Sequence, residues 1–353
     1  MSSQSGPTST NSSHPPLTLF TFPESVFALR TARYLNLRSI PFTQIRVPPN
    51  MPRPLLSFKL GINYRRIPIL SIGRDIYIDT RLIIRKVEAT IGDPATRLGA
   101  KDAFGSGIED MLEEFIIDGG PFWRTAGLIP TDSPLVQDPI WMKDRFDGSG
   151  GQFTKEALEE NRAWNLSQAR LYWGMVDKML TDGREWMLGG EKPGLAEIHA
   201  AWVFDWGVGM AEGDERYAAK KDVRRELGEE RFPSVWGWVR RFREVCEEAE
   251  RRNEGVGEMK EGGEAEDAVV EKILSSQSHE GENLAFDEDD VLGLKYGQMV
   301  SIAPTDFGFT HKDEGTLVGL TKDEAVIEIL APNDGGRLRL HYPRINFKIL
   351  PVE

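Results

Sequence analysis

Cysteine is nearly absent from this chain of 353 residues, since Cys246 is the only one. A single cysteine excludes an internal disulfide framework and any metal site built from several cysteines. The five histidines are scattered, and no two of them stand at metal-ligand spacing. We therefore expect no metal, and we expect a reducing compartment such as the cytoplasm.

Long apolar runs and basic stripes are also missing. No run is long enough to span a bilayer, which argues against a membrane partner. No cluster of lysine and arginine stands out, which argues against a nucleic-acid partner. The net charge of −13 arises mostly between residues 254 and 290, where 13 acidic residues face two lysines. Because the rest of the chain is close to neutral, this acidity says little about a substrate.

The patterns along the chain predict several domains, as its length also suggests. Residues 1–16 are polar and are expected to form a disordered tail. Strand-like and helix-like patterns alternate over 17–92 in the order β-α-β-(α)-β-β-α, and 95–252 is helical throughout. An acidic linker follows over 253–290, with a short amphipathic stretch that could dock on a neighbour. Five short alternating strands over 291–353 predict a small β-barrel-like module.

The helical region contains all nine tryptophans, which we expect mainly in a core, with some lining an apolar cleft. The apolar spacing predicts four helices, at 100–119, 152–180, 194–211 and 232–252. The segments "PFWRTAGLIPTDSP" and "DRFDGSGG" are expected to be irregular connections. Position and apolarity suggest four candidate pocket residues, Phe22, Phe122, Trp123 and Trp173, although a place in the core is the favoured alternative for each.

Two features of the first 92 residues have both a structural and a functional interpretation. Pro68 opens the strand-like run "IPILSI", although proline cannot donate to a ladder. A trans proline at a first strand position would explain it. Asp79 and Thr80 precede an apolar helical stretch, where they would serve as a helix cap. A helix N-terminus is also an anion-binding site, so the same pair would suit a carboxylate ligand.

Four segments together resemble a known family. They are "FPESVFALR", "YRRIPIL", "YIDTRLII" and "MLGGEKPGLAEIHAAW", in this order. They resemble a glutathione S-transferase over about 235 residues. This resemblance implies a thioredoxin-like N-terminal domain followed by an all-helical domain, hence a multidomain α/β plus all-α fold with the small β module added. With that extra module, the chain is similar to a fungal transferase-like group of uncertain substrate.

The resemblance assigns a glutathione site to the residues that the patterns single out. It implies that the bond before Pro68 is cis and that the backbone of Ile67 pairs with the peptide backbone of glutathione. It implies that Thr80 and its helix end hold the γ-glutamyl carboxylate, while Asp79 faces the amino group. Without the resemblance, capping alone would explain Asp79 and Thr80.

The resemblance also points to Ser25 as the catalytic residue. A hydroxyl at the N-terminus of the first helix would stabilise the thiolate of glutathione. The first strand ends at Thr21 and Phe22, so classes that use tyrosine or cysteine there are disfavoured. Glu24 departs from the expected pattern, because a carboxylate beside a thiolate opposes its formation. The alternative is that Ser25 is only a first-turn residue.

These observations favour a glutathione transferase of detoxification type. Glutathione would be the co-substrate, and a hydrophobic electrophile would lie against Phe22 and Trp123. The family commonly forms homodimers, so a homodimer is also considered. The rival hypothesis is a non-catalytic scaffold that recruits a partner through the linker or through residues 291–353.

Overall fold

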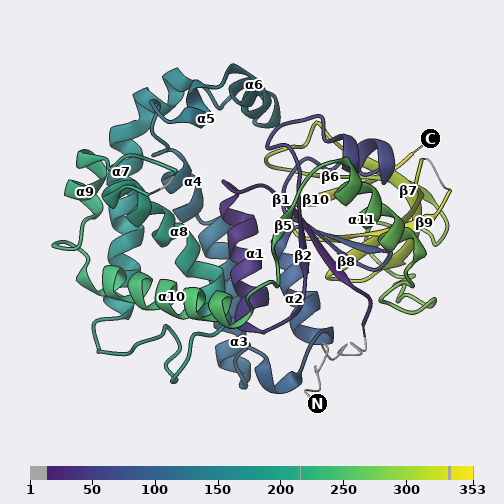
Figure 1. Ribbon diagram of the computed structural model, residues 1–353, viewed down its shortest axis with the longest axis horizontal. Helices are drawn as coiled ribbons and strands as arrows, with labels where there is room; N and C mark the ends of the chain where they lie inside the picture. Colours follow the sequence, from purple (N-terminus) through teal and green to yellow (C-terminus); the bar gives the residue numbers. More distant parts are fainter. Residues whose placement is uncertain (1–13, 215, 333–334, 353) are drawn as a thin grey trace, which may run out of the picture.

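The computed structural model describes residues 14–214, 216–332 and 335–352, and the predicted tail over 1–16 therefore falls almost entirely outside the described residues. Figure 1 shows three parts side by side: helices on the left, a sheet with its helices in the centre, and a strand-rich module on the right. The helical part and the strand-rich module each contact the central part, so the central part forms two junctions.

The central part has the predicted order of strands and helices. Its elements are β1 (Leu17–Thr21), α1 (Val26–Leu37), β2 (Thr43–Arg46), a π-helical turn (Leu55–Lys59), β3 (Ile69–Ile72), β4 (Asp75–Ile78) and α2 (Thr80–Thr90). β1 pairs parallel with β2 and antiparallel with β3, and β3 forms a hairpin with β4. Both helices begin at a side-chain cap, Ser25 for α1 and Asp79 for α2.

The helical part contains the four predicted helices as α3 (Ala103–Ile117), α7 (Lys155–Met179), α8 (Leu195–Glu212) and α10 (Pro233–Arg252). The prediction of irregular connections was wrong, because the first segment contains α4 (Pro121–Ala126) and the second begins inside α6 (Pro139–Gly148), with α5 (Pro134–Gln137) between them. Each begins with a proline, which is tolerated in a first helical turn, and each is too short for apolar periodicity to show. A short 3₁₀ turn (Pro94–Thr96) precedes α3, and α9 (Lys221–Leu227) precedes α10.

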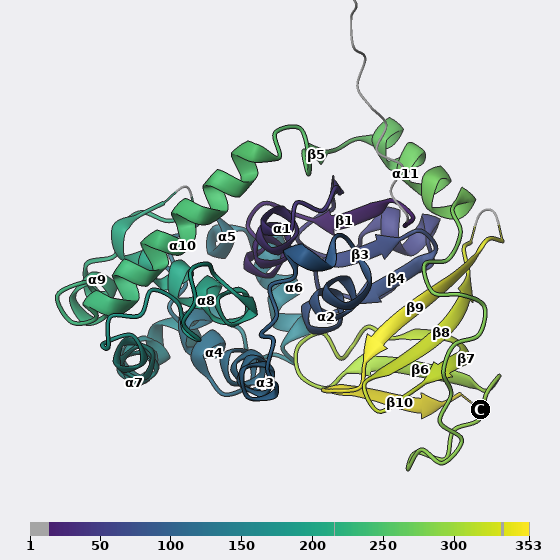
Figure 2. The same ribbon diagram turned by 90° about the horizontal axis from the view of Figure 1, so that it is seen from below.

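The C-terminal strands form an antiparallel sheet, as their alternating pattern predicts. They are β6 (Met299–Pro304), β7 (Asp313–Leu320), β8 (Glu324–Leu330), β9 (Arg337–Pro343) and β10 (Phe347–Pro351). β9 also pairs parallel with β4, through Asp75 to Arg339 and Tyr77 to His341. One ten-stranded sheet results, in the order β10-β6-β7-β8-β9-β4-β3-β1-β2-β5, with β5 (Met259–Lys260) at its other edge. The module is thus a continuation of the central sheet, as Figure 2 shows.

The acidic segment between α10 and β6 contains α11 (Gly263–Ser275), the amphipathic stretch noted in the sequence. Its apolar side chains Val269, Val270 and Ile273 are buried in a core that the central part and the module share. Lys59 Nζ lies 2.8 Å from Asp267 on its polar side. This helix therefore docks on the central part, and Figure 2 shows it above the sheet.

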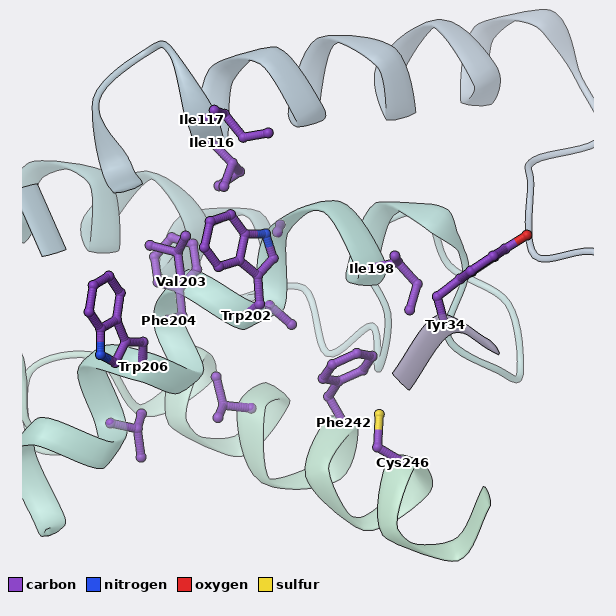
Figure 3. Close-up of a cluster of buried hydrophobic side chains, with 14 of the residues drawn as sticks. Tyr34, Ile116, Ile117, Ile198, Trp202, Val203, Phe204, Trp206, Phe242 and Cys246 are labelled. Carbon is purple, nitrogen blue, oxygen red and sulfur yellow. The ribbon is translucent and has the colours of Figure 1, made fainter. Parts of the chain in front are cut away.

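A second core joins the central part to the helices. Figure 3 shows part of it, with Trp202, Val203 and Phe204 of α8 lying between α3 and α10. Seven of the nine tryptophans are buried, which confirms the core interpretation for most of them. Among the described residues, no helix has the length and apolarity needed to cross a bilayer.

Candidate functional site

The site is a pocket where all three parts of the molecule meet. Its volume is about 230 Å³. This is room for several water molecules at roughly 30 Å³ each, so it is not a packing defect. Of the nine residues named from the sequence for the site or its pocket, Trp173 does not line it and eight do: Phe22, Ser25, Ile67, Pro68, Asp79, Thr80, Phe122 and Trp123. The fold brings together residues that are up to about a hundred positions apart in the sequence.

Ser25 is held at the N-terminus of α1 by its own capping bond. Its Oγ accepts a hydrogen bond from the Ala28 N–H at 3.2 Å, and the residue is 8% exposed. The hydroxyl proton has no acceptor in the described part of the chain. Ser25 can therefore cap the helix and still donate its proton into the pocket, where the helix end also favours negative charge.

The peptide bond between Ile67 and Pro68 is cis, as the family resemblance implied. Both residues precede the first ladder residue of β3, Ile69. Among the described residues, the backbone N–H of Ile67 has no hydrogen-bond partner. A free backbone amide beside a strand end suits an extended peptide ligand.

Asp79 and Thr80 form the start of α2 at another wall of the pocket. Asp79 Oδ1 accepts the Arg81 N–H at 3.0 Å, which confirms the capping interpretation. Asp79 also has φ = 71°, a left-handed conformation that is costly for a residue with a side chain. Such strain gathers at functional sites, where the surrounding fold maintains it. Capping and ligand binding are therefore compatible here.

A buried arginine, which the sequence did not single out, supports Thr80 from behind. Arg30 of α1 is 1% exposed and donates to Thr80 Oγ1 at 3.2 Å and to the Ile198 carbonyl at 3.0 Å. It also pairs with Glu113, which lies 3.0 Å from His199. Burial alone would raise the pKa of Glu113, but His199 and Arg30 hold it well below its usual range. Because Arg30 donates to Thr80, the Thr80 hydroxyl remains free to donate to a ligand.

Three arginines that line the pocket lie close to one another: Arg53, Arg65 and Arg145. Arg53 donates only to backbone carbonyls, including Pro48 at 2.9 Å. Burial, followed by the neighbouring Arg145, lowers its pKa to about 9. Arg65 pairs with Asp144 at 2.9 Å and also with Asp147, so it is engaged within the protein.

The wall opposite Ser25 is aromatic. The rings of Phe122 and Trp123 from α4 lie 4.8 Å apart, and Trp206 of α8 stacks on Phe122 at 6.3 Å. Trp123 is 38% exposed, so part of its ring is open to a ligand. Trp173 was wrongly assigned to the pocket: it is 1% exposed and packs against Phe204 and Phe232 in the core. Position in a helical sequence does not tell which side of the helix faces a cleft.

The C-terminal module supplies the third wall, which the sequence did not predict. Asp306 and Phe307, in the turn after β6, line the pocket. Asp306 Oδ1 lies 3.1 Å from Arg66 Nη2, and the Phe307 ring centre lies 5.5 Å from Arg145. In the sequence, Pro304-Thr305-Asp306 is only a turn signal, and nothing near it indicates a site.

Two family models match this chain. Residues 19–95 match the glutathione S-transferase N-terminal domain, and residues 124–251 match a domain of unknown function (DUF7962). Residues 19–95 therefore form a glutathione S-transferase N-terminal domain. The central part is thus a thioredoxin-like domain, and every predicted site residue except Phe122, Trp123 and Trp173 lies within it.

Solved structures share the glutathione S-transferase fold with this chain. A GST-like protein from Pseudomonas syringae is 20% identical, with a TM-score of 0.66, over 96% of this chain and 99% of that chain. At this coverage, the similarity of fold extends through the C-terminal strands. A family member from Pseudomonas fluorescens Pf-5 with two glutathione bound is 18% identical, with a TM-score of 0.44, over 66% of this chain and 91% of that chain. No curated protein matches.

Two other chemical candidates lie outside the pocket. Glu280, Glu324 and His341 are grouped as metal ligands could be, but Lys86 Nζ lies 2.9 Å from Glu324 and already places a cation there. Cys246 is 1% exposed in α10, and burial raises the pKa of its thiol to about 12. Neither group provides a nucleophile or a Lewis acid for chemistry in the pocket.

Proposed function

We propose that this protein is a glutathione transferase that binds glutathione in the three-walled pocket and conjugates it to a hydrophobic electrophile. The observation that carries this proposal is that Ser25, the open backbone of Ile67 and the helix end at Thr80 all line one pocket. A thiol, a peptide backbone and a carboxylate of one tripeptide would find a partner there. The lone buried cysteine fits a reducing, cytoplasmic location, where glutathione is in its thiol form.

The proposed chemistry uses groups at two places in the pocket, the start of α2 with Thr80 and the start of α1 with Ser25. The γ-glutamyl carboxylate would accept hydrogen bonds from the start of α2, including the Thr80 hydroxyl. The thiol would lose its proton to solvent, and the Ser25 hydroxyl would donate to the resulting thiolate. The sulfur would then form a bond to an electrophilic carbon held against Trp123, and the leaving group would depart with its electron pair. Binding both substrates side by side supplies the proximity.

The test is Ser25→Ala, with Ser25→Thr as the control that keeps a hydroxyl. We expect Ser25→Ala to raise the apparent pKa of the bound thiol and to lower kcat with an aryl halide by about 10²-fold. Ultraviolet absorbance of bound thiolate measures the first effect, and steady-state kinetics measure the second. Wild-type turnover by Ser25→Ala would contradict the role of Ser25, and failure to bind immobilised glutathione would contradict the whole proposal.

One observation favours the rival, a non-catalytic scaffold. Glu24 lines the same pocket directly beside Ser25, and a carboxylate there opposes a thiolate. Binding of glutathione without conjugation of any aryl halide or epoxide would support this second function. The same kinetic experiment therefore separates the two hypotheses.

A further inference from the structure

The turn after β6 places the carboxylate of Asp306 beside Arg66 at the pocket. Arg66 Nη1 lies 3.3 Å from Asp306 Oδ2 and 3.7 Å from Asp79 Oδ2. One guanidinium thus stands between two carboxylates, one from the start of α2 and one from the C-terminal module. All three residues line the pocket, as does Arg81, whose Nη1 lies 3.8 Å from Asp79 Oδ2.

Several polar atoms of Asp306 and Arg66 make no hydrogen bond within the described part of the chain. Asp306 Oδ1 is buried without a hydrogen-bond partner in the described part of the chain, although it lies 3.1 Å from Arg66 Nη2. The Nε and Nη2 atoms of Arg66 are unpartnered in the same way. Arg66 offsets the charge of Asp306, but Asp306 Oδ1 accepts no aligned hydrogen bond, and a donor that arrives with a ligand would satisfy it.

The turn that carries Asp306 is fixed in place. The Thr305 N–H donates to the Asn346 carbonyl at 2.9 Å, and the Gly308 N–H donates to the Gly148 carbonyl of α6 at 2.7 Å. His311 Nδ1 lies 3.2 Å from Arg65 Nη1. These contacts tie the turn to the thioredoxin-like domain and to the helical domain, so Asp306 is positioned before any ligand binds.

From this geometry we infer that Asp306 binds the α-ammonium group of the γ-glutamyl residue, so that the C-terminal module completes the glutathione site. This inference rests on the proposed function. An ammonium group has three N–H donors, and Asp306 Oδ1 and Asp79 Oδ2 are two acceptors on either side of Arg66. The carboxylate of the same amino-acid group belongs at Thr80, where donors converge. The ammonium group of the ligand would then meet carboxylates, and its carboxylate would meet hydrogen-bond donors.

The test combines Asp306→Asn with a glutathione analogue in which hydrogen replaces the α-amino group. For the wild type, we expect loss of the amino group to weaken binding by about tenfold to hundredfold, the range of hydrogen bonds to charged groups. Asp306→Asn should weaken glutathione binding by a similar factor but change binding of the analogue less than about twofold. Calorimetric titration with each ligand gives the four affinities.

Three further measurements separate recognition from a structural role. Asp289→Asn, at an exposed acid of the linker outside the pocket, should leave all affinities unchanged. If Asp306→Asn folds poorly, Asp306→Glu provides a second test. It keeps the carboxylate and should retain part of the affinity for glutathione. At saturating glutathione, kcat of Asp306→Asn should stay within about twofold of the wild type, because only binding is affected.

Two results would overturn the inference while leaving the proposed function intact. In the first, Asp306→Asn weakens glutathione and the analogue equally, which means that Asp306 only positions Arg66. In the second, it weakens neither ligand. If the wild type binds no glutathione at all, the proposed function fails together with this inference.

Discussion

The thioredoxin-like domain meets its two neighbours through different kinds of contact. Toward the helical domain, helix packs on helix around an apolar core, with the buried Arg30 and Glu113 as its charged centre. Toward the C-terminal module, strand pairs with strand, β4 with β9, and the buried His341 lies beside Asp75. The first junction is made by side chains and the second largely by backbone groups.

This difference explains what each junction does for the site. The helical junction places Thr80 and the aromatic wall, because Arg30 connects α1 to α2, α3 and α8. The strand junction covers the edge of β4, which would otherwise offer unpaired backbone groups to other chains. It also places the turn with Asp306 at the mouth of the pocket. The pocket therefore depends on both junctions.

Breaking the strand junction should have the largest effect. We expect a chain that ends after residue 252 to lose its soluble, cooperatively folded state. Such a chain would expose the β4 edge together with Ile76 and Ile78, which are fully buried against the module and α11. Soluble yield and thermal unfolding measure this loss. A soluble fragment with the unfolding temperature of the full chain would show that the module is only an accessory.

The contrast between the junctions also separates what the sequence could predict from what it could not. Ser25, Pro68 and Thr80 were predictable because each has a local signature, a cap or a proline at a strand start. Strand content of the module followed from alternation. The β4–β9 pairing was not predictable, because backbone ladders between distant segments leave no side-chain pattern beyond alternation. Asp306 and Arg30 were missed for the same reason, since only the tertiary fold brings them to the site.

Breaking the helical junction at its charged centre should have the next largest effect. Arg30→Met would leave Glu113 buried with His199 but without its arginine partner, at an expected cost of about 3–5 kcal/mol in the free energy of unfolding. Urea denaturation measures this value. Arg85→Met, at an exposed pair with Asp323, should cost less than about 1 kcal/mol. If Arg30→Met with Glu113→Leu is no more stable than Arg30→Met alone, the unpaired charge is not the cause.

The pH dependence of stability should show how much the buried His341 contributes to the strand junction. His341 Nδ1 lies 2.7 Å from Glu324, and Nε2 lies 3.3 Å from Asp75. Burial lowers the pKa of His341, but hydrogen bonds to Asp75 and Glu324 outweigh it, so the folded-state pKa is raised. The groups that face the ring from the packed elements are Asp75, Tyr77, Lys86, Glu280 and Glu324.

Because the folded-state pKa is the higher one, this contribution is complete below the unfolded pKa of about 6.5 and is lost as pH rises through the folded value. We expect the free energy of unfolding to decrease as pH rises above about 6.5, and His341→Gln to flatten that decrease. Urea unfolding at several pH values provides the measurement. An identical slope in wild type and His341→Gln would place the titrating group elsewhere.

The smallest effect is expected at the pocket itself, on the side of the helical junction. Glu24 is half-buried beside Ser25, so its charge is partly screened. Glu24→Gln should therefore lower the apparent pKa of the bound thiol slightly and raise kcat/KM near neutral pH by a few-fold. Glu191→Gln, at an exposed loop, is the matched control. The pH profile of kcat/KM distinguishes the cases: a shift toward lower pH supports repulsion of the thiolate, whereas a loss of activity would mean that Glu24 takes part in binding.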